Sequence, residues 1–212
     1  MSQSKELYEA ILNGDAKKAH AATDSAIAAG MEPVVLIAES MVPAMDEVGR
    51  LYEAEEYFVP ELLLAGRAMR SAFELLRPLM AISGEKMATK VIIGTVKGDL
   101  HDIGKNIVGS MLEGSGFEVV DLGTDVSPEK FVAAVKEQKP QFVCLSALLT
   151  VTMPAMKTTI EALESAGLRT TVKVLVGGAP VTSQYATEIG ADGYSENANG
   201  AVSLVRNFVE AA

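Results

Sequence analysis

The feature that most constrains the fold is an alternation of short β-rich runs with helical stretches from residue 89 onward. The runs fall at 90–96, 117–122, 142–148, 172–176 and, more weakly, 193–194. Helical patterns follow them at 103–113, 128–137, 154–166, 181–189 and 198–209. This alternation predicts an α/β fold with a flavodoxin-like or Rossmann-like five-stranded parallel sheet in the order 2-1-3-4-5, covered by helices on both faces.

The first 80 residues carry a purely helical pattern. We expect helices at 5–12, 15–29, 32–52 and from 60 to about 80, with stops at Asn13-Gly14 and Gly30. Apolar residues in the last two recur in steps of three and four, which predicts one buried face on each. Four helices with short connections indicate a bundle. Residues 81–88 have no clear period and form the expected linker, so the predicted domains are 1–88, helical with linker, and 89–212, α/β.

Composition removes several classes of function. The 212 residues have a formal net charge of −10, which argues against nucleic acid or an anionic membrane as the main partner. A single cysteine, Cys144, excludes an internal disulfide framework, a thiolate-built zinc site and a protein-held iron–sulfur cluster. The first residues lack an apolar signal core, and no apolar run reaches the length of a membrane span. We therefore expect a soluble cytoplasmic protein.

The residues suited to chemistry lie where predicted strands end. The first strand is followed by Gly98-Asp99-Leu100-His101-Asp102-Ile103-Gly104. His101 can ligate a metal or act as a base, and Asp99 can accept the proton on its other ring nitrogen. Asp102 suits the N-cap of the next helix, where Gly104 removes a side chain.

Two further motifs follow later strands. The third strand leads into Ser146-Ala147-Leu148-Leu149-Thr150-Val151-Thr152, and the fourth into Gly177-Gly178. Paired glycines allow a bulky ligand to approach the backbone. Because ligands bind beyond the carboxyl ends of parallel strands, the three motifs predict one shared crevice.

These motifs resemble a known signature. Asp99-x-His101-x-x-Gly104, Ser146-x-Leu148 and Gly177-Gly178 are similar to the cobalamin-binding signature of methionine synthase and its relatives. The segments 45–49 and 56–65 resemble the helical cap of the same family. Within this family, the chain most resembles the corrinoid protein of anaerobic methyltransferase systems. These proteins carry methyl groups from methanol, methylamines, methoxylated aromatics or betaines.

The resemblance assigns roles to individual residues. It implies that His101 is the lower axial ligand of cobalt, replacing the benzimidazole, and that Asp99 and Thr152 continue a relay from it. Ser146 and Leu148 would lie beside the displaced nucleotide tail. The other implied cofactor-binding residues are Gly98, Asp102, Ile103, Gly104, Thr150, Gly177 and Gly178, together with Phe58 and Leu62 or Leu63, which would cover the upper face.

The implied function is that of a methyl carrier. Co(I) of bound cobalamin would accept a methyl group from a substrate-specific methyltransferase. A second methyltransferase would pass it to a thiol or a tetrahydrofolate-type acceptor, and a reductive activator would complete the system. Since no separate substrate pocket is evident, the chain would turn over only with these partners, and naming it an enzyme is a matter of convention.

Other interpretations of the same residues stay open. D-x-H-x-x-G also occurs in small subunits of adenosylcobalamin mutases and in cobalamin-dependent regulators, and a cobalamin-free flavodoxin-like domain is the third alternative. Phe58 and Leu62 can equally be core residues. Lys105 could contact a corrin amide or phosphate, or be a solvated helix start. Cys144 is expected to be a buried, inert thiol, and His20 to be exposed.

Overall fold

The computed structural model describes residues 3–83 and 89–211, and the chain divides into two compact units. One unit contains the N-terminal helices and Ser110–Phe117. The other contains Thr89–Gly109 and the chain from Glu118 onward. Residues 81–83 of the expected linker are helical, and residues 84–88 lie outside the described part. The domain boundary at 88/89 therefore stays a prediction.

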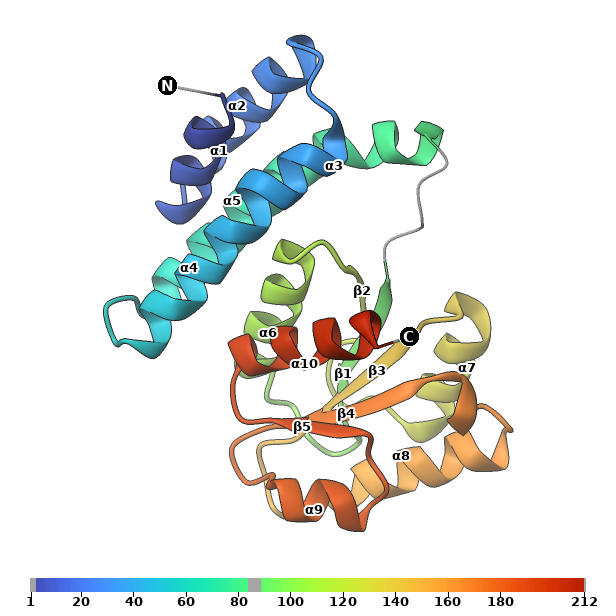
Figure 1. Cartoon of the computed structure of the whole chain (residues 1–212). Coiled ribbons are helices and arrows are strands. Elements are labelled where there is room, and N and C mark those ends of the chain that lie inside the picture. The colour runs from blue at the N-terminus through green and yellow to red at the C-terminus, as the bar shows by residue number, and fades with distance from the viewer. Residues whose placement is uncertain (1–2, 84–88, 212) are drawn as a thin grey trace. The chain divides into compact units, whose positions relative to one another are not determined.

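The N-terminal unit is helical, as the sequence predicts (Figure 1). Its elements are α1 (Gln3–Leu12), α2 (Ala16–Ala28), α3 (Pro33–Leu36), the π-helical turn η1 (Ile37–Met41), α4 (Val42–Glu53) and α5 (Val59–Ser83). Asp15 caps α2, since its carboxylate accepts the Lys18 N–H at 3.0 Å.

A widened turn interrupts the predicted helix at 32–52. The helical backbone runs from Pro33 to Glu53, but Ile37–Met41 is π-helical and Pro43 follows directly in the first turn of α4. A proline inside a helix has no N–H to donate, and its ring clashes with the carbonyl four residues earlier. A π turn just before it relieves both problems. Pro43 is the signal for this turn.

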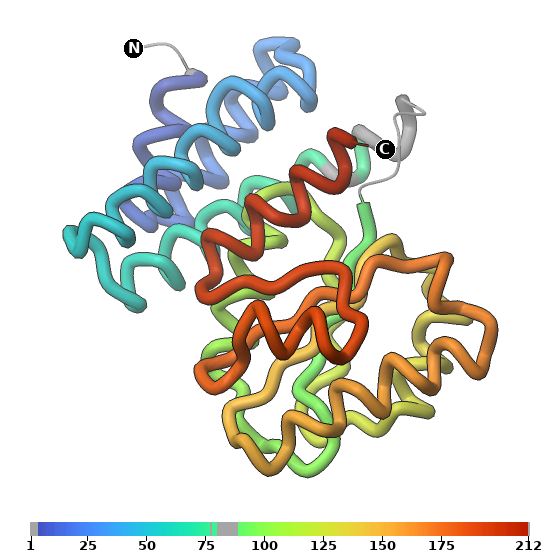
Figure 2. Tube along the Cα trace, turned by 60° about the horizontal axis from the view of Figure 1, so that its bottom comes forward, coloured from blue at the N-terminus to red at the C-terminus, as the bar shows by residue number. Residues whose placement is uncertain are grey.

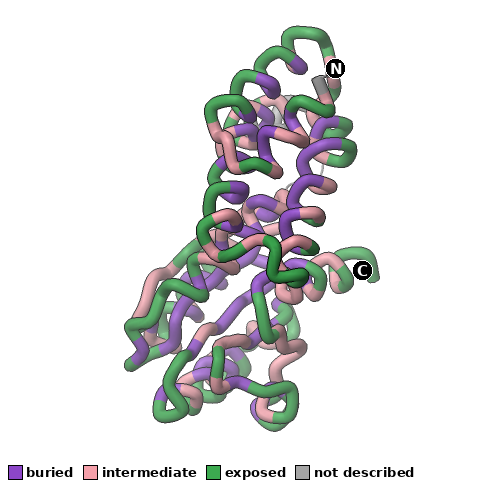
Figure 3. The backbone as a smooth tube through the Cα atoms, turned by 90° about the vertical axis from the view of Figure 1, so that its left-hand side faces the viewer, coloured by how far each residue is buried: buried purple, intermediate pink, exposed green. Residues whose placement is uncertain are grey.

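The helices bury one side each. Figure 3 shows buried residues alternating with exposed ones along the N-terminal helices, as amphipathic helices require. Methionine fills much of this interior, consistent with its use as an adaptable core residue. The largest fully buried side chains of these helices are Leu7, Ile11, Leu36, Met41, Met45, Leu62, Met69 and Leu76.

The α/β unit contains the predicted five-stranded sheet. Its strands are β1 (Lys90–Thr95), β2 (Glu118–Asp121), β3 (Phe142–Ser146), β4 (Lys173–Gly177) and β5 (Gly193–Ser195). Every pairing is parallel and the order is β2-β1-β3-β4-β5, which confirms the predicted topology. The helices are α6 (Ile103–Gly114), α7 (Pro128–Gln138), α8 (Pro154–Ser165), α9 (Ser183–Glu188) and α10 (Ala198–Glu210), with a 3₁₀ turn η2 (Arg169–Thr171). Among the described helices, none combines the length and apolar character of a membrane span.

The sheet is buried between two helical layers. One contiguous core cluster joins alternate residues of β1, β3 and β4 to α7, α8 and α9. Figures 1 and 2 show α6 and α10 on the opposite side from α7 and α8. Because both faces are covered, the central strands are almost continuously apolar. The carboxyl ends of the strands are left as the accessible edge.

Candidate functional site

The strand register brings the three sequence motifs to one edge of the sheet. Thr95, the last residue of β1, pairs with Ser146 at the end of β3. Ser146 in turn pairs with Gly177 at the end of β4, and Gly177 pairs with Ser195. The loops that contain His101, Leu148 and Gly178 start directly beyond this row. The structure therefore confirms that the three motifs converge on one edge of the sheet.

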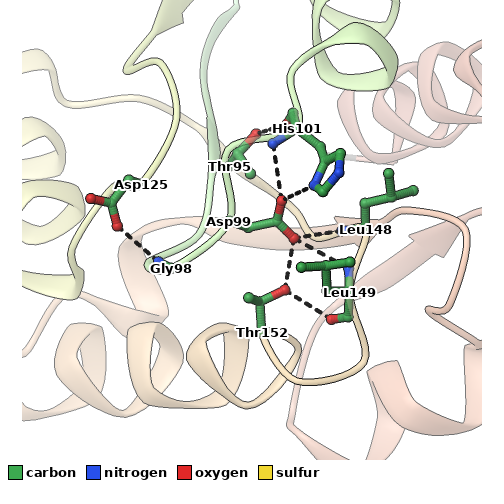
Figure 4. Close-up of polar contacts among 8 residues, drawn as sticks. All are labelled: Thr95, Gly98, Asp99, His101, Asp125, Leu148, Leu149 and Thr152. Carbon is green, nitrogen blue, oxygen red and sulfur yellow. Dashed lines mark hydrogen bonds and ion pairs between the residues drawn. The ribbon is translucent and has the colours of Figure 1, made fainter.

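Asp99 is the centre of the site (Figure 4). Its side chain is 0% exposed, and both carboxylate oxygens accept several donors. Oδ1 lies 3.0 Å from the His101 backbone nitrogen and 2.7 Å from His101 Nδ1. Oδ2 lies 2.7 Å from the Thr152 hydroxyl and accepts backbone N–H groups of Leu148 at 2.8 Å and Leu149 at 3.3 Å. A buried carboxylate with this many donors is satisfied as the anion.

Two opposing effects act on the pKa of Asp99. Burial by itself would raise this pKa, since it penalises the charged form. The hydrogen bonds from Thr152 and from the backbone N–H groups of His101 and Leu148, with that of the His101 ring, outweigh burial. They hold the pKa of Asp99 well below its usual range, so this group is ionised at neutral pH.

The ionised Asp99 decides which His101 nitrogen is available. A carboxylate can only accept a hydrogen bond, so the contact at 2.7 Å requires the proton on His101 Nδ1. In the neutral imidazole, Nε2 then carries the free lone pair. The His101 side chain is 49% exposed, and Figure 4 shows the ring extending from Asp99 with its far edge directed away. His101 is thus prepared to ligate a metal through Nε2.

Glycine stands at positions 98 and 104 of the His101 loop for different physical reasons. Gly98 has φ +83°, a left-handed conformation that glycine adopts without a steric penalty. Gly104 lies in the first turn of α6, and a Cβ placed there would meet nothing within 4 Å. Glycine is unfavourable in a helix, and here neither backbone conformation nor packing of the protein requires it. This open position is what the approach of a ligand would require.

The remaining residues of the first motif lie at the surface. Asp102 and Ile103 are exposed, and Ile103 begins α6. The Asp102 carbonyl accepts the Asn106 N–H at 2.8 Å, as an N-cap residue does, and its carboxylate contacts the Asn106 side chain at 3.1 Å. Leu100 is 73% exposed and Ile103 72% exposed, so large apolar side chains flank His101 without protein covering them.

The β3 motif is divided between the site and the surface. Ser146 is half-buried at the end of β3, whereas Leu148 and Thr150 are exposed in the loop that follows. The Thr152 hydroxyl lies 2.7 Å from Asp99 Oδ2 and 2.8 Å from the Leu149 carbonyl. The structure therefore joins Thr152, Asp99 and His101 in one chain of contacts.

The paired glycines are explained by close backbone approach. Gly178 has φ +128°, and a Cβ there would lie 1.9 Å from the Ala147 carbonyl oxygen. A Cβ on Gly177 would lie 3.0 Å from the Ser195 carbonyl oxygen. Packing of the sheet edge alone accounts for glycine at Gly178, so the predicted role of both residues beside a nucleotide tail stays a prediction.

The proposed cap residues differ in exposure. Phe58 directly precedes α5 and is 62% exposed, and its N–H donates to Glu61 Oε2 at 2.9 Å. Leu62 is 1% exposed and lies in the interior, as the core alternative for this residue predicts. Leu63 and Leu64 are exposed. Of the two leucines that the resemblance offered for the cap, Leu62 and Leu63, only Leu63 is exposed.

Sequence reasoning missed two residues and misjudged a third. Thr95 Oγ1 donates to the His101 carbonyl at 2.8 Å, and Asp125 contacts the loop at Gly98. Lys105 is 3% exposed and bonded to Asp121, so the solvated helix start, one of the two alternatives for this residue, is wrong. Nothing in the sequence around Lys105 indicated that it pairs with the carboxylate of Asp121, 16 residues later in the chain.

The site supplies a single nitrogen ligand. Among the residues that the structure describes, no group of three or more His, Cys, Asp or Glu side chains is arranged to hold a metal ion. A bare zinc ion would need about three or four such ligands. One exposed imidazole beside apolar side chains suits a metal whose other ligands come with a cofactor.

Comparisons with known proteins cover both halves of the chain. A family model described as a B12 binding domain matches residues 89–203, and a second model of the same description matches residues 3–89. The trimethylamine corrinoid protein of Methanosarcina barkeri is 47% identical over 200 residues, which cover 93% of this chain and 92% of that protein. The dimethylamine corrinoid protein 1 of Methanosarcina acetivorans is 43% identical over 180 residues, or 84% of each.

Solved structures agree with this result. The methanol:cobalamin methyltransferase complex MtaBC of Methanosarcina barkeri contains a chain that matches with a TM-score of 0.84 and 31% identity, over 99% of this chain and 80% of that one. A cobalamin-binding protein from Desulfitobacterium hafniense DCB-2 matches with a TM-score of 0.80 and 35% identity, over 98% of each chain. The resemblance noted in the sequence is thereby confirmed.

Proposed function

Because the chain belongs to the B12-binding family of corrinoid proteins, we propose that it is a methyl carrier that binds cobalamin through His101. The observation that carries the proposal is the contact of Asp99 with His101 Nδ1, which leaves Nε2 as an exposed ligand atom. Bound cobalamin supplies the cobalt that takes up and gives away the methyl group. The protein binds the cofactor, orients it and sets its electrostatic surroundings.

The residues around His101 suit the lower face of a corrinoid. Gly104 leaves open space beside the start of α6, and Leu100 and Ile103 present uncovered apolar surface. Leu148, 43% exposed, adds apolar surface from the β3 loop. Ser146, Thr150, Gly177 and Gly178 are the proposed neighbours of the nucleotide tail, and Phe58 and Leu63 the proposed cover of the upper face.

Asp99 and Thr152 tune the ligand in this proposal. Asp99 holds the proton on His101 Nδ1 and raises the donor strength of Nε2. The Thr152 hydroxyl stabilises the Asp99 anion at 2.7 Å. Loss of such a supporting contact typically lowers metal affinity or activity about 10–100-fold.

The carrier requires protein partners. We propose a substrate-specific methyltransferase that delivers the methyl group, a second methyltransferase that removes it to a thiol or tetrahydrofolate-type acceptor, and a reductive activator. The relatives named for trimethylamine and dimethylamine make methylated amines the first donors to test. A cytoplasmic location is part of the proposal.

Reconstitution with hydroxocobalamin tests this function. The wild-type protein should retain the corrinoid through gel filtration and have the visible spectrum of imidazole-ligated cobalt. His101→Ala should bind more weakly and change the spectrum, whereas His20→Ala is the matched control, because these are the chain's two histidines and His20 is exposed on α2. A wild-type protein that releases cobalamin, or a His101→Ala protein with an unchanged spectrum, would contradict the proposal.

The donor is tested separately. The reduced, reconstituted protein is mixed with a methylamine-specific or a methanol-specific methyltransferase and its substrate. Methylation of the bound corrinoid, read from its absorbance, identifies the donor class. Methylation with a methylated amine and none with methanol is the expected result.

A further inference from the structure

The loop after β2 runs alongside the end of β1 and the first residues of the loop that contains His101. Val126 forms a parallel bridge with Val96, and its N–H donates to the Thr95 carbonyl at 3.0 Å. The Thr95 N–H donates to the Gly123 carbonyl at 3.0 Å. This register places Asp125, which belongs to none of the sequence motifs, directly beside Gly98 and Asp99.

Asp125 binds both ends of the Gly98–Asp99 segment, and Figure 4 shows its contact with Gly98. Its Oδ1 accepts the Gly98 N–H at 2.8 Å, and its own N–H donates to the Asp99 carbonyl at 2.9 Å. The Asp99 N–H donates to the Val96 carbonyl at 3.1 Å, so the backbone on both sides of the Asp99 side chain is fixed. Asp125 itself has φ +52°, a left-handed conformation in which aspartate and asparagine are tolerated best.

We propose that Asp125 is a positioning residue for His101, acting through Gly98 and Asp99. By fixing the Gly98–Asp99 backbone, it directs the Asp99 carboxylate at His101 Nδ1 and so keeps the proton on that nitrogen. Thr95 completes the support at the other end of the loop, through its hydroxyl on the His101 carbonyl. The effect on the imidazole is a property of the protein alone, and the effect on cobalt ligation rests on the proposed function.

A simpler role for Asp125 is its ion pair with Lys97. The Lys97 ammonium lies 2.9 Å from Asp125 Oδ1, but the two side chains are 57% and 41% exposed. Exposed pairs of this kind contribute little, because water screens them. The hydrogen bond to Gly98 holds the backbone next to Asp99, whereas the ion pair holds the exposed end of the Lys97 side chain. The two roles can be separated by substitution.

Three variants make the separation. Asp125→Gly keeps access to the left-handed conformation and the N–H donated to Asp99, and removes the carboxylate that accepts from Gly98 and pairs with Lys97. Asp125→Asn keeps an acceptor oxygen for Gly98 and removes the charge. Lys97→Gln removes the ion pair and leaves Asp125 in place. All three are compared as full-length protein.

The first readout uses corrinoid-free protein. Imidazole ¹⁵N chemical shifts at alkaline pH report which ring nitrogen carries the proton, and His20 is an internal reference in the other unit. In wild type, Asp125→Asn and Lys97→Gln, His101 should be mainly protonated on Nδ1. In Asp125→Gly this preference should be lost, while His20 is unchanged in every protein. Protection of the Gly98 amide from hydrogen exchange in the wild type checks the same contact without any substitution.

The second readout uses hydroxocobalamin. Asp125→Gly should lower the affinity about tenfold and reduce the imidazole-ligated fraction in the visible spectrum, with Asp125→Asn and Lys97→Gln near wild type. An Asp125→Gly protein with wild-type tautomer and spectrum, a Lys97→Gln protein with the same loss, or an unprotected Gly98 amide overturns the proposal. If no variant or wild type binds cobalamin, the proposed function fails, and the tautomer measurement still decides the role of Asp125.

Discussion

The ammonium group of Lys105 lies 2.5 Å from Asp121 Oδ2, with only 2% of the lysine side chain exposed. Asn106 Oδ1 accepts a second hydrogen bond from it at 2.6 Å. Asp121 is the last residue of β2, so this pair ties the first turn of α6 to the sheet. The cation that follows Gly104 in the sequence is therefore used inside the protein, close to the loop that bears His101.

Asp121→Ala should destabilise the protein more than Lys105→Met. The first variant leaves a buried cation without its counter-ion, with an expected loss of about 2 kcal/mol in the free energy of unfolding. This is below the range for fully buried pairs, because the Asp121 side chain is 46% exposed. Lys105→Met removes the charge and keeps most of the apolar volume. Urea unfolding of both variants and of the double variant measures the coupling, and additive losses would show that the pair is not coupled.

Thr152→Val should remove one hydrogen bond to Asp99 while keeping the shape of the side chain at position 152. It removes the donor 2.7 Å from Asp99 Oδ2 and leaves the N–H groups of Leu148 and Leu149. We expect a loss of about 1 kcal/mol in the free energy of unfolding and weaker hydroxocobalamin binding. Thr152→Ser keeps the hydroxyl and should restore most of both. Spectroscopic titration and urea unfolding measure them, and equal behaviour of Val and Ser would contradict a role for the hydroxyl.

The fold could be predicted because its signals are local. Buried parallel strands are short apolar runs, and the glycine, proline and polar residues between them mark the helix and strand ends of the α/β unit to within about two residues. The helix α5 instead continues to Ser83, beyond its expected end at about residue 80. The site motifs were placed correctly for the same reason, since they follow the strands directly. The π turn before Pro43 was not predicted, since the expected helix at 32–52 was continuous, although a proline inside a helical pattern is a local signal for such an irregularity.

What the sequence did not reveal depends on contacts between distant segments. Asp125 reaches Gly98 because the β2–α7 loop runs beside β1, and Lys105 is buried because Asp121 ends the neighbouring strand. Neither pair has a recognisable spacing. The burial of Leu62, by contrast, was indicated by the sequence, because Leu62 continues the apolar stripe of Ala65, Met69 and Leu76 along one face of α5. Its place in the cap was implied only by the resemblance.

The stability of the wild type should fall in acid because of Asp99. Hydrogen bonds hold the pKa of the Asp99 carboxyl in the folded protein below the ordinary value of 3.8, against the opposing effect of burial. The unfolded chain therefore binds a proton that the folded protein does not, so this stabilisation is complete above about pH 5 and is lost as the pH falls below it. Urea unfolding between about pH 3.5 and 6 should give a steeper pH dependence for wild type than for Asp99→Asn. Thr152→Val should be intermediate, and identical slopes in all three proteins would refute the assignment.

Cys144 should be unreactive in the folded protein. It lies inside β3, and burial raises the pKa of its thiol to about 12. At pH 8 the reactive thiolate is therefore on the order of 10⁻⁴ of the total. Ellman's reagent should find no reactive thiol in native protein and one per chain in denaturant, since Cys144 is the only cysteine. Rapid labelling of native protein would mean that β3 is accessible to solvent.

Gly104 and Gly178 should respond in opposite ways to alanine. At Gly178 the added Cβ would lie 1.9 Å from the Ala147 carbonyl oxygen in a backbone with φ +128°, so Gly178→Ala should be strongly destabilising. At Gly104 the added Cβ would meet nothing within 4 Å, and alanine is favoured over glycine in a helix by up to about 1 kcal/mol. Gly104→Ala should therefore leave the corrinoid-free protein as stable as wild type or more stable. The same variant should bind hydroxocobalamin more weakly, because the methyl group occupies space that the proposed ligand needs. Thermal unfolding without corrinoid and a binding titration measure the two effects, and unchanged affinity in a stabilised Gly104→Ala protein would show that no ligand approaches α6 at this position.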